Sequence, residues 1–150
     1  MAIQTSFQID HNHAYNGMIA DGQLQNIVSR LNIDDETIGF GIPVWGEGTA
    51  KASDDMFVGI TVREIHNRNY FEGSKAGFAP GDTMSVLNSG VMWIQLDEGV
   101  TVKAGDKVAF DTATGKYVAD VADGVELEGA EWLTDSDAKG FAKLRITIGA

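Results

Sequence analysis

Residues 80–119 decide the fold, and they read PGDTMSVLNSGVMWIQLDEGVTVKAGDKVAFDTATGKYVA. Apolar side chains alternate with polar or small ones on both sides of Asn88-Ser89-Gly90, and again after Ala104-Gly105-Asp106. A period of two is typical of strands that bury one face, and short links that contain glycine are typical of hairpins. The stretch therefore predicts two β-hairpins, the first turning at residues 88–90 and the second at Thr112–Gly115.

The chain after this stretch predicts one short strand and one longer one. Residues 121–129 are acidic and read as irregular chain, whereas Ala130–Leu133 predicts a short strand. In Phe141–Ile148, Leu144, Ile146 and Ile148 alternate with polar residues. That alternation predicts a closing strand with one dry face.

The region before Pro80 predicts two more strands and two loops. Met56–Val62 is apolar on both faces, which is typical of a central strand. In Ile38–Val44 apolar residues alternate with glycine, which predicts a strand closely approached by another backbone. Pro43 favours a sheet edge or a strand end. Residues 45–55 and 65–78 are rich in turn-forming residues and predict loops.

Residues 1–35 are interpreted as an N-terminal arm, and residues 36–150 as the body. Leu24, Ile27, Val28 and Leu31 have the spacing of one face of a short helix, which Asp21 would cap. The β-branched pair Ile27-Val28 fits an extended segment equally well. The arm has more apolar side chains than a short peptide can bury alone, so we expect partner contacts. The candidate contact residues are Tyr15, Met18, Ile19, Leu24 and Ile27.

Length, composition and strand count together predict an all-β chain. The expected architecture is a single compact β-sandwich or barrel of eight or nine short strands, with an extended N-terminal arm. A chain of 150 residues with a hydrophobic fraction of 43% can bury a core as one domain. The chain has no cysteine, so packing alone must hold this fold.

Charge limits the classes of partner. The sequence has 22 acidic and 11 basic residues, a formal net charge of −11, without the clustered Lys and Arg that bind phosphates. No apolar run approaches the ~20 residues of a membrane span, and the start lacks a signal-peptide pattern. We therefore expect no nucleic-acid partner, no membrane partner, and synthesis in the cytoplasm.

Possible metal and catalytic residues are better explained by ordinary structural roles. His11 and His13 could share an ion on a strand, but a third ligand is missing and the sole other histidine is His66. Several carboxylates have part of a calcium-loop pattern, and turn carboxylates more often bind backbone N–H groups. These are Asp54-Asp55, Asp111 in the segment 111–115, and Asp135 with Asp137. We expect no catalytic residue, no metal and no cofactor.

Tryptophans suggest an alternative function. Trp45, Trp93 or Trp132 could form an exposed stacking platform in a module that binds glycans or other small molecules. For Trp93 and Trp132, a place in the core or in an interface is the favoured interpretation, because an aromatic ring buries a large area.

Across nearly its whole length the chain resembles the structural cement proteins of tailed bacteriophages. The resemblance lies in the order and spacing of short motifs: Ala14–Asp21, Ser29-Arg30, Ile38–Gly41, Phe57–Ile60, Pro80–Asp82, Val91–Ile94, Val102–Val108 and Ala142–Ile146. One departure is Asn16, where the family commonly has proline before Gly17. Without the restraint of the proline ring, we expect a looser turn at this point.

The resemblance implies a non-enzymatic decoration protein on the outer surface of the virion. Such proteins bind the major capsid protein, act as dimers or trimers, bridge adjacent capsomers and resist the pressure of packaged DNA. The acidic composition agrees with a position away from the genome.

Overall fold

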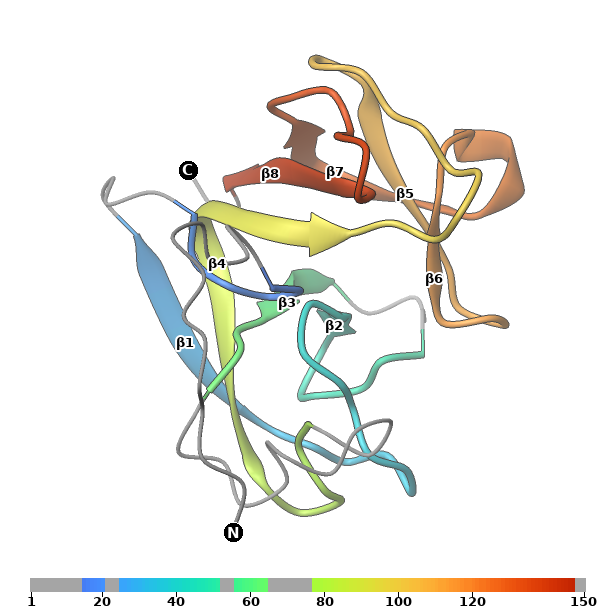
Figure 1. Ribbon diagram of the computed structural model, residues 1–150. Coiled ribbons are helices and arrows are strands. Elements are labelled where there is room, and N and C mark those ends of the chain that lie inside the picture. The colour runs from blue at the N-terminus through green and yellow to red at the C-terminus, as the bar shows by residue number, and fades with distance from the viewer. Residues whose placement is uncertain (1–14, 21–24, 52–55, 65–76, 148–150) are drawn as a thin grey trace, which may run out of the picture.

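The computed structural model describes residues 15–20, 25–51, 56–64 and 77–147 (Figure 1). They form one eight-stranded sheet that curls into a half-barrel, which confirms the predicted all-β class and strand number. The strands are β1 (Asn26–Leu31), β2 (Pro43–Trp45), β3 (Phe57–Thr61), β4 (Thr83–Gln95), β5 (Lys107–Asp111), β6 (Lys116–Val118), β7 (Val125–Trp132) and β8 (Phe141–Thr147). No helix in these ranges is long and apolar enough to cross a membrane.

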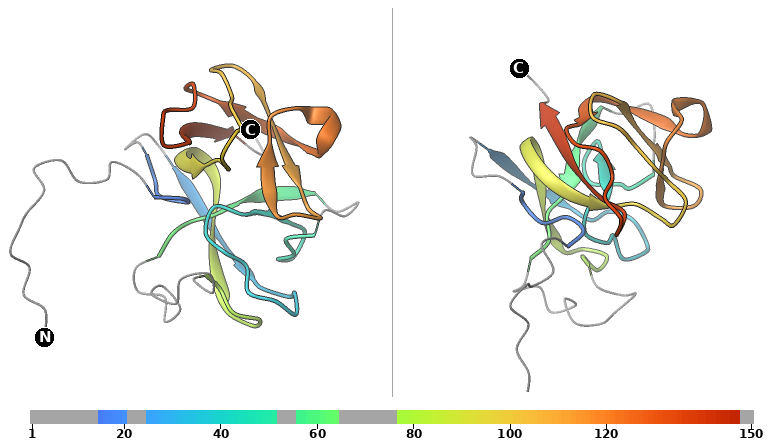
Figure 2. Two further views of the ribbon diagram at one scale, coloured as in Figure 1. Left: turned by 45° about the vertical axis from the view of Figure 1, so that its right-hand side comes forward. Right: turned by 45° about the horizontal axis from the view of Figure 1, so that its top comes forward.

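The longest strand, β4, takes part in both halves of the sheet. Its first half pairs with β1 on one side and with β3 on the other, and its second half pairs with β8. The strand order is β2-β3-β4-β8-β7-β5-β6, with β1 paired to β4 outside this path. Figures 1 and 2 show β4 turning sharply midway, so that the two halves of the sheet face one another.

The hairpin predicted at residues 88–90 is wrong, because the chain bends there without reversing. Ser89 pairs with Asn26 of β1 and with Thr147 of β8, and the β1 register shifts past Asn88. The Asn88 amide donates to the Val58 carbonyl at 2.8 Å. A bulge next to a glycine bends a strand and increases its twist, which uses the same residue types as a tight turn.

The remaining strand predictions have mixed outcomes. The β5–β6 hairpin around Thr112–Gly115, the central position of β3 and the closing strand β8 are confirmed. Pro43 begins the edge strand β2, as predicted. The strand predicted from Ile38 is wrong before Pro43, where the structure has a single bridge between Ile38 and Phe78. Trp45, predicted in a loop, belongs to β2.

The irregular stretch predicted at residues 121–129 is also wrong. A short 3-10 turn, η2 (Val121–Asp123), is followed by β7, which starts at Val125. The first half of β7 exposes Glu126 and Glu128 and buries Leu127. Its acidic residues lie on the solvent face, so the single inward apolar residue was too little to reveal the period of two.

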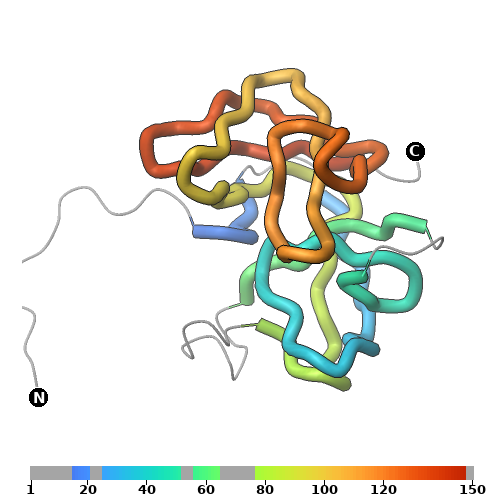
Figure 3. The backbone as a smooth tube through the Cα atoms, turned by 90° about the vertical axis from the view of Figure 1, so that its right-hand side faces the viewer, coloured from blue at the N-terminus to red at the C-terminus, as the bar shows by residue number. Residues whose placement is uncertain are grey.

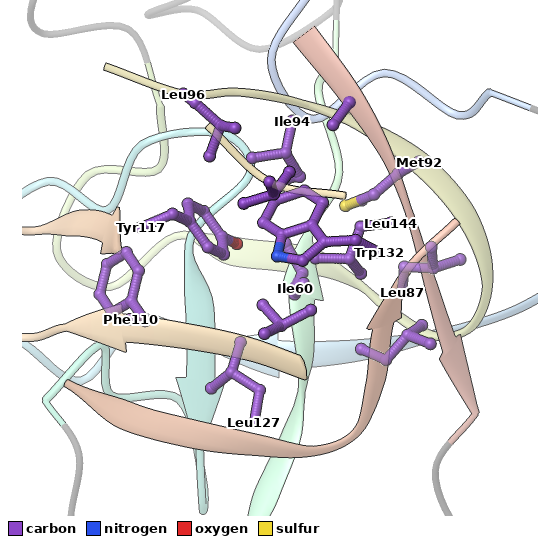
Figure 4. Packing of buried hydrophobic residues seen from close by; sticks show 14 of the residues in the cluster. Ile60, Leu87, Met92, Ile94, Leu96, Phe110, Tyr117, Leu127, Trp132 and Leu144 are labelled. Atoms are coloured by element: carbon purple, nitrogen blue, oxygen red, sulfur yellow. The ribbon is translucent and has the colours of Figure 1, made fainter. Parts of the chain in front are cut away.

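Two apolar clusters form the core. The larger cluster fills the space between the two halves of the sheet and contains Trp132, Phe110, Tyr117, Leu127, Ile60, Leu87, Met92, Ile94 and Leu144 (Figure 4). The smaller cluster lies on the other face of β4 and contains Ile38, Phe40, Val44, Val58, Phe78, Met84 and Val86. The tube view in Figure 3 shows the segment 38–51 running below the β5–β6 hairpin. β4 contributes side chains to both clusters.

Candidate partner-binding surface

The predicted contact residues fall in two segments that both pair with β4. Tyr15, Met18 and Ile19 belong to the segment 15–20, and Ile27 belongs to β1. Leu24 lies outside the described residues, as do His11, His13, His66, Asp54 and Asp55. The structure thus brings four of the five predicted contact residues to the two halves of one strand.

Residues 15–20 are joined to the second half of β4 by backbone hydrogen bonds. The Gly17 amide donates to the Trp93 carbonyl at 2.9 Å, and the Trp93 amide donates to the Met18 carbonyl at 2.8 Å. The Ala20 amide donates to the Val91 carbonyl at 3.0 Å, and Ile19 pairs with Met92. Ile19 packs against the larger core cluster. These residues are therefore part of the sheet, and Tyr15, 46% exposed, is the most accessible of the three predicted contacts here.

Asn16 holds this segment on the body through its side chain. Its side-chain amide donates to the Phe40 carbonyl at 2.8 Å, and its Oδ1 accepts from the Gln95 amide at 3.0 Å. The Met18 amide closes the turn by donating to the Tyr15 carbonyl at 3.1 Å. Asparagine loses the ring restraint of proline but gains two long-range hydrogen bonds, which fix the turn.

Gly17 allows the closest backbone approach in this region. Its φ of +80° is left-handed, and a Cβ built on it would lie 2.8 Å from the Gly41 nitrogen. A residue with a side chain would suffer both backbone strain and a steric clash. The turn and the segment around Gly41 therefore fit together only because Gly17 is glycine.

Arg63 clamps the same turn from β3's side of the sheet. Its backbone amide donates to the Gly17 carbonyl at 2.9 Å, and its Nε donates to the Asn16 carbonyl at 3.0 Å. The guanidinium carbon lies 5.3 Å from the centre of the Tyr15 ring and 5.2 Å from that of Phe40. A guanidinium over aromatic faces is favourable, more so when water is excluded. We call residues 15–20, with Arg63, the anchor.

A buried tyrosine supports the segment on which the anchor rests. The Tyr117 hydroxyl donates to the Gly41 carbonyl at 2.8 Å, which ties β6 to the segment beside Gly17. Burial raises the pKa of Tyr117 well above its ordinary value, because the phenolate cannot be solvated there. The hydroxyl therefore stays protonated and donates this hydrogen bond through neutral pH.

β1 settles the open choice between a helix and an extended segment in favour of a strand. Val28 packs against the smaller core cluster, while Ile27 is 43% and Leu31 49% exposed. Ile33, two residues beyond β1, is 52% exposed. Side chains of a strand alternate between its faces, so Ile27, Leu31 and Ile33 follow one outward row. Sequence reasoning missed Ile33; a period of two in place of the helical spacing would have found it.

The acidic turn residues bind backbone N–H groups, as predicted. Asp111 accepts from the Ala113 amide at 2.9 Å, and Asp135 accepts from the Ala104 amide at 2.8 Å. Asp137 accepts from the amides of Lys139 and Phe141 at 2.9 and 3.0 Å. Within the described ranges, no three His, Cys, Asp or Glu side chains gather where they could hold a metal ion.

The tryptophans do not form a common stacking platform. Trp45 and Trp132 are buried, with 3% and 1% of their surface exposed, so neither can stack on a ligand from solvent. Trp93 is half-buried, and the Lys143 ammonium lies 5.3 Å from the centre of its indole. This arrangement corrects the glycan-platform hypothesis for Trp45 and Trp132.

Comparison with known proteins gives one family and one structural relative. A family profile described as "Structural cement protein (E217 gp24/Pam3 gp6)" matches residues 3–147. The structure is similar to a chain from the capsid of Myoviridae phage XM1, with a TM-score of 0.74 over 100% of both chains at 13% identity. At that identity the likeness shows a shared fold. No curated protein matches. Since the family profile covers almost the entire sequence, the chain belongs to the phage structural cement protein family.

Proposed function

We propose that this protein binds the outer surface of a phage head, contacts the major capsid protein and bridges adjacent subunits as a dimer or trimer. The observation that carries the proposal is the family match over residues 3–147, which implies a structural role in a phage capsid. Its site of action would be the virion surface, reached after synthesis in the host cytoplasm. The activity is mechanical stabilisation, without a catalytic step.

The exposed apolar residues around β1 supply a contact surface for this role. Ile27, Leu31 and Ile33 are each between 43% and 52% exposed. Apolar side chains at such exposure gain free energy when a partner removes them from water, at about 25 cal/mol per Å². A row of them on one face of an edge strand is typical of an interaction site.

The charge of the protein supports a position outside the shell. With a net charge of −11, the chain is repelled by the phosphates of packaged DNA. Acidic copies also repel one another in solution, which keeps the protein soluble until it binds the head. We therefore propose no nucleic-acid contact.

The anchor gives the proposed arm a fixed origin. We propose that the arm within residues 1–35 extends from the body at the anchor, since residues 15–20 and β1 both pair with β4. We place the arm's capsid contacts in residues 1–14. Weak contacts repeated over many copies give high avidity, so no single interface has to be strong.

The test uses heads assembled without cement protein, to which the purified full-length chain is added. We expect the chain to pellet with the heads and to raise the temperature at which they release DNA. Removal of residues 1–14 should abolish pelleting and leave the circular-dichroism melting curve unchanged, because the deletion spares the anchor. Removal of residues 1–20 should also lower the melting temperature, because it strips residues 15–20 from β4. The proposal fails if the intact chain neither pellets with heads nor changes their stability.

The location on the outer surface has a separate test. Protease treatment of decorated, DNA-filled heads should degrade this chain before the major capsid protein loses its fold. Protection of the chain from protease until the shell opens would place it inside and contradict the proposal.

A further inference from the structure

We infer that β1 is the strand through which two copies of this chain associate, pairing edge to edge and antiparallel. The inference deepens the proposed self-association by naming its surface, and it is independent of where the protein sits on the head. Two observations carry it: the backbone groups that β1 turns away from β4, and the symmetry of those groups about one residue.

The direction of the β1 backbone groups follows from hydrogen bonds at its end. The Asn32 amide donates to the Asp82 carbonyl beside β4 at 2.9 Å, whereas the Ile33 amide donates to Gly48, on the opposite side, at 3.2 Å. The Ser85 carbonyl, opposite Ser29, accepts from the Val62 amide at 2.9 Å and so faces away from β1. Backbone groups alternate sides along a strand. Those of Ile27, Ser29 and Leu31 therefore point away from β4.

Only part of this edge is open. The Leu31 carbonyl is covered by Gly48, whose backbone lies so close that a side chain there would overlap the oxygen. The Ser29 carbonyl accepts from its neighbour, the Arg30 guanidinium, at 2.9 Å in an exposed contact that an amide of another strand can replace. Within the described residues, the N–H and C=O of Ile27 and the N–H of Ser29 have no strand beside them. An edge of this kind is a template for another strand.

The open positions are related by two-fold symmetry. Ile27 and Ser29 lie on either side of Val28, so antiparallel pairing centred on Val28 sets Ile27 of each copy opposite Ser29 of the other. Opposed residues of this type exchange both of their backbone hydrogen bonds. The two Ile27 side chains become diagonal neighbours on the outward face, where each is 43% exposed alone. A strand that fits its own copy in this way forms an isologous interface.

Charge favours a second copy at this edge. From Gly22 to Ile33 the sequence has no acidic residue and a single charge, Arg30, in a chain of net charge −11. Two copies that repel one another elsewhere can approach here, and Asn26 of each copy lies opposite Arg30 of the other in the symmetric register. The other sheet edges are poorer: β2 and β6 have three residues each, and Pro43 of β2 has no N–H.

Sedimentation equilibrium of the full chain tests this inference with two variants and a control. We expect a dimer whose dissociation constant rises by at least about tenfold in Ile27→Lys and in Ser29→Pro, equivalent to ~1.4 kcal/mol. Lysine at position 27 sets two like charges diagonally across the interface. Proline at position 29 removes an N–H that faces away from β4, so the β1–β4 hydrogen bonds remain. The matched control is Val125→Lys, at an apolar residue of similar exposure (38%) on another strand, which should leave the constant unchanged.

Three outcomes would overturn the inference. The first is a wild-type chain that stays monomeric at millimolar concentration. The second is a dimer that persists in both variants, or in Ile27→Lys alone if Ser29→Pro does not fold. The third is the same persistent dimer together with loss of head binding in both variants, which would in addition assign β1 to the capsid protein. Monomeric variants that still pellet with heads support the inference, and a wild-type dimer that never binds heads refutes only the proposed function.

Discussion

The anchor and β1 both add to β4, yet they are held there by different means. Residues 15–20 meet the second half of β4 and are fixed further by the Asn16 side chain, by Arg63 and by the fit of Gly17 against Gly41. β1 meets the first half in an antiparallel register that is regular from Ile27 to Leu31, and its outward row stays exposed. A strand that packs only one face on the core, as β1 does through Val28, thus leaves its other face available to partners. Side-chain contacts on several sides make residues 15–20 part of the body.

This difference separates stability from binding along the first part of the chain. Substitutions in the anchor should lower the free energy of unfolding, because they remove buried or tightly fitted contacts. Substitutions on the outward row of β1 should leave that free energy unchanged and alter association instead. Paired substitutions in the two segments measure the contrast, and they are given in order of decreasing expected effect.

The largest effect is expected for Gly17→Ala. The left-handed φ costs about 1–2 kcal/mol with a side chain, and the overlap with Gly41 adds roughly 1–3 kcal/mol. Gly81→Ala is the matched control, because Gly81 has a similar φ of +84° and no atom lies within 4 Å of the place that its Cβ would take. Urea unfolding should show Gly17→Ala to be clearly the more harmful. Equal losses would mean that the contact with Gly41 contributes nothing.

Asn16→Ala should cost about 2 kcal/mol, since it deletes both long-range side-chain hydrogen bonds. The matched substitution in β1 is Asn26→Ala, where the exposed amide makes one long contact of 3.4 Å to Asn88. We expect that loss to stay within about 0.5 kcal/mol. The two midpoints of chemical unfolding measure the contrast, and a smaller loss at Asn16 than at Asn26 would contradict the role given to the anchor.

Ile19→Ala and Ile27→Ala remove the same atoms from the two segments. Ile19 packs against the larger core cluster, so its truncation should cost about 1–2 kcal/mol. Ile27 is 43% exposed, and its truncation should change stability by less than about 0.5 kcal/mol. Thermal unfolding at low protein concentration, where association does not contribute, compares them. Similar losses would show that β1 is as much part of the core as the anchor is.

Tyr117→Phe should have the smallest effect at neutral pH, about 1 kcal/mol, from the loss of the hydrogen bond to Gly41. The substitution should also change how the free energy of unfolding depends on pH. Because burial raises the pKa of Tyr117 in the folded state, the unfolded chain releases this proton first as pH rises above about 10. The unfolded state then binds fewer protons, so stability falls with pH. Unfolding midpoints between pH 9 and 11 should fall more steeply in the wild type than in Tyr117→Phe, and parallel slopes would exclude this coupling.

The sequence was most informative where one face of a strand is dry. β8 and the β5–β6 hairpin follow their apolar periods and turn residues. β3, buried along both faces, was found from its continuous apolar run. It misled at Asn88–Gly90, because the residues that allow a chain reversal also allow a bend, and the choice depends on which strands arrive on either side. The secondary structure of β1 was ambiguous for a related reason, since a short apolar run fits a helix and a strand alike.

The candidate surface was only partly predictable. The sequence marked Tyr15, Met18, Ile19 and Ile27 as apolar residues without a local partner, but it could not tell which of them the body itself would cover. That distinction depends on long-range contacts such as those from Asn16 to Phe40 and to Gln95, which join residues far apart in the chain. A pattern within one short window contains no information about them.

The unbroken passage of β4 through both halves of the sheet has a mechanical consequence. A force applied to one half of the sheet is transmitted to the other half through the covalent backbone of β4. The two halves therefore cannot separate at a non-covalent interface between them. The two halves should consequently lose their slowly exchanging amide hydrogens together, as one cooperative unit. Under sustained tension the protein should therefore keep its native structure until the whole domain unfolds in one step.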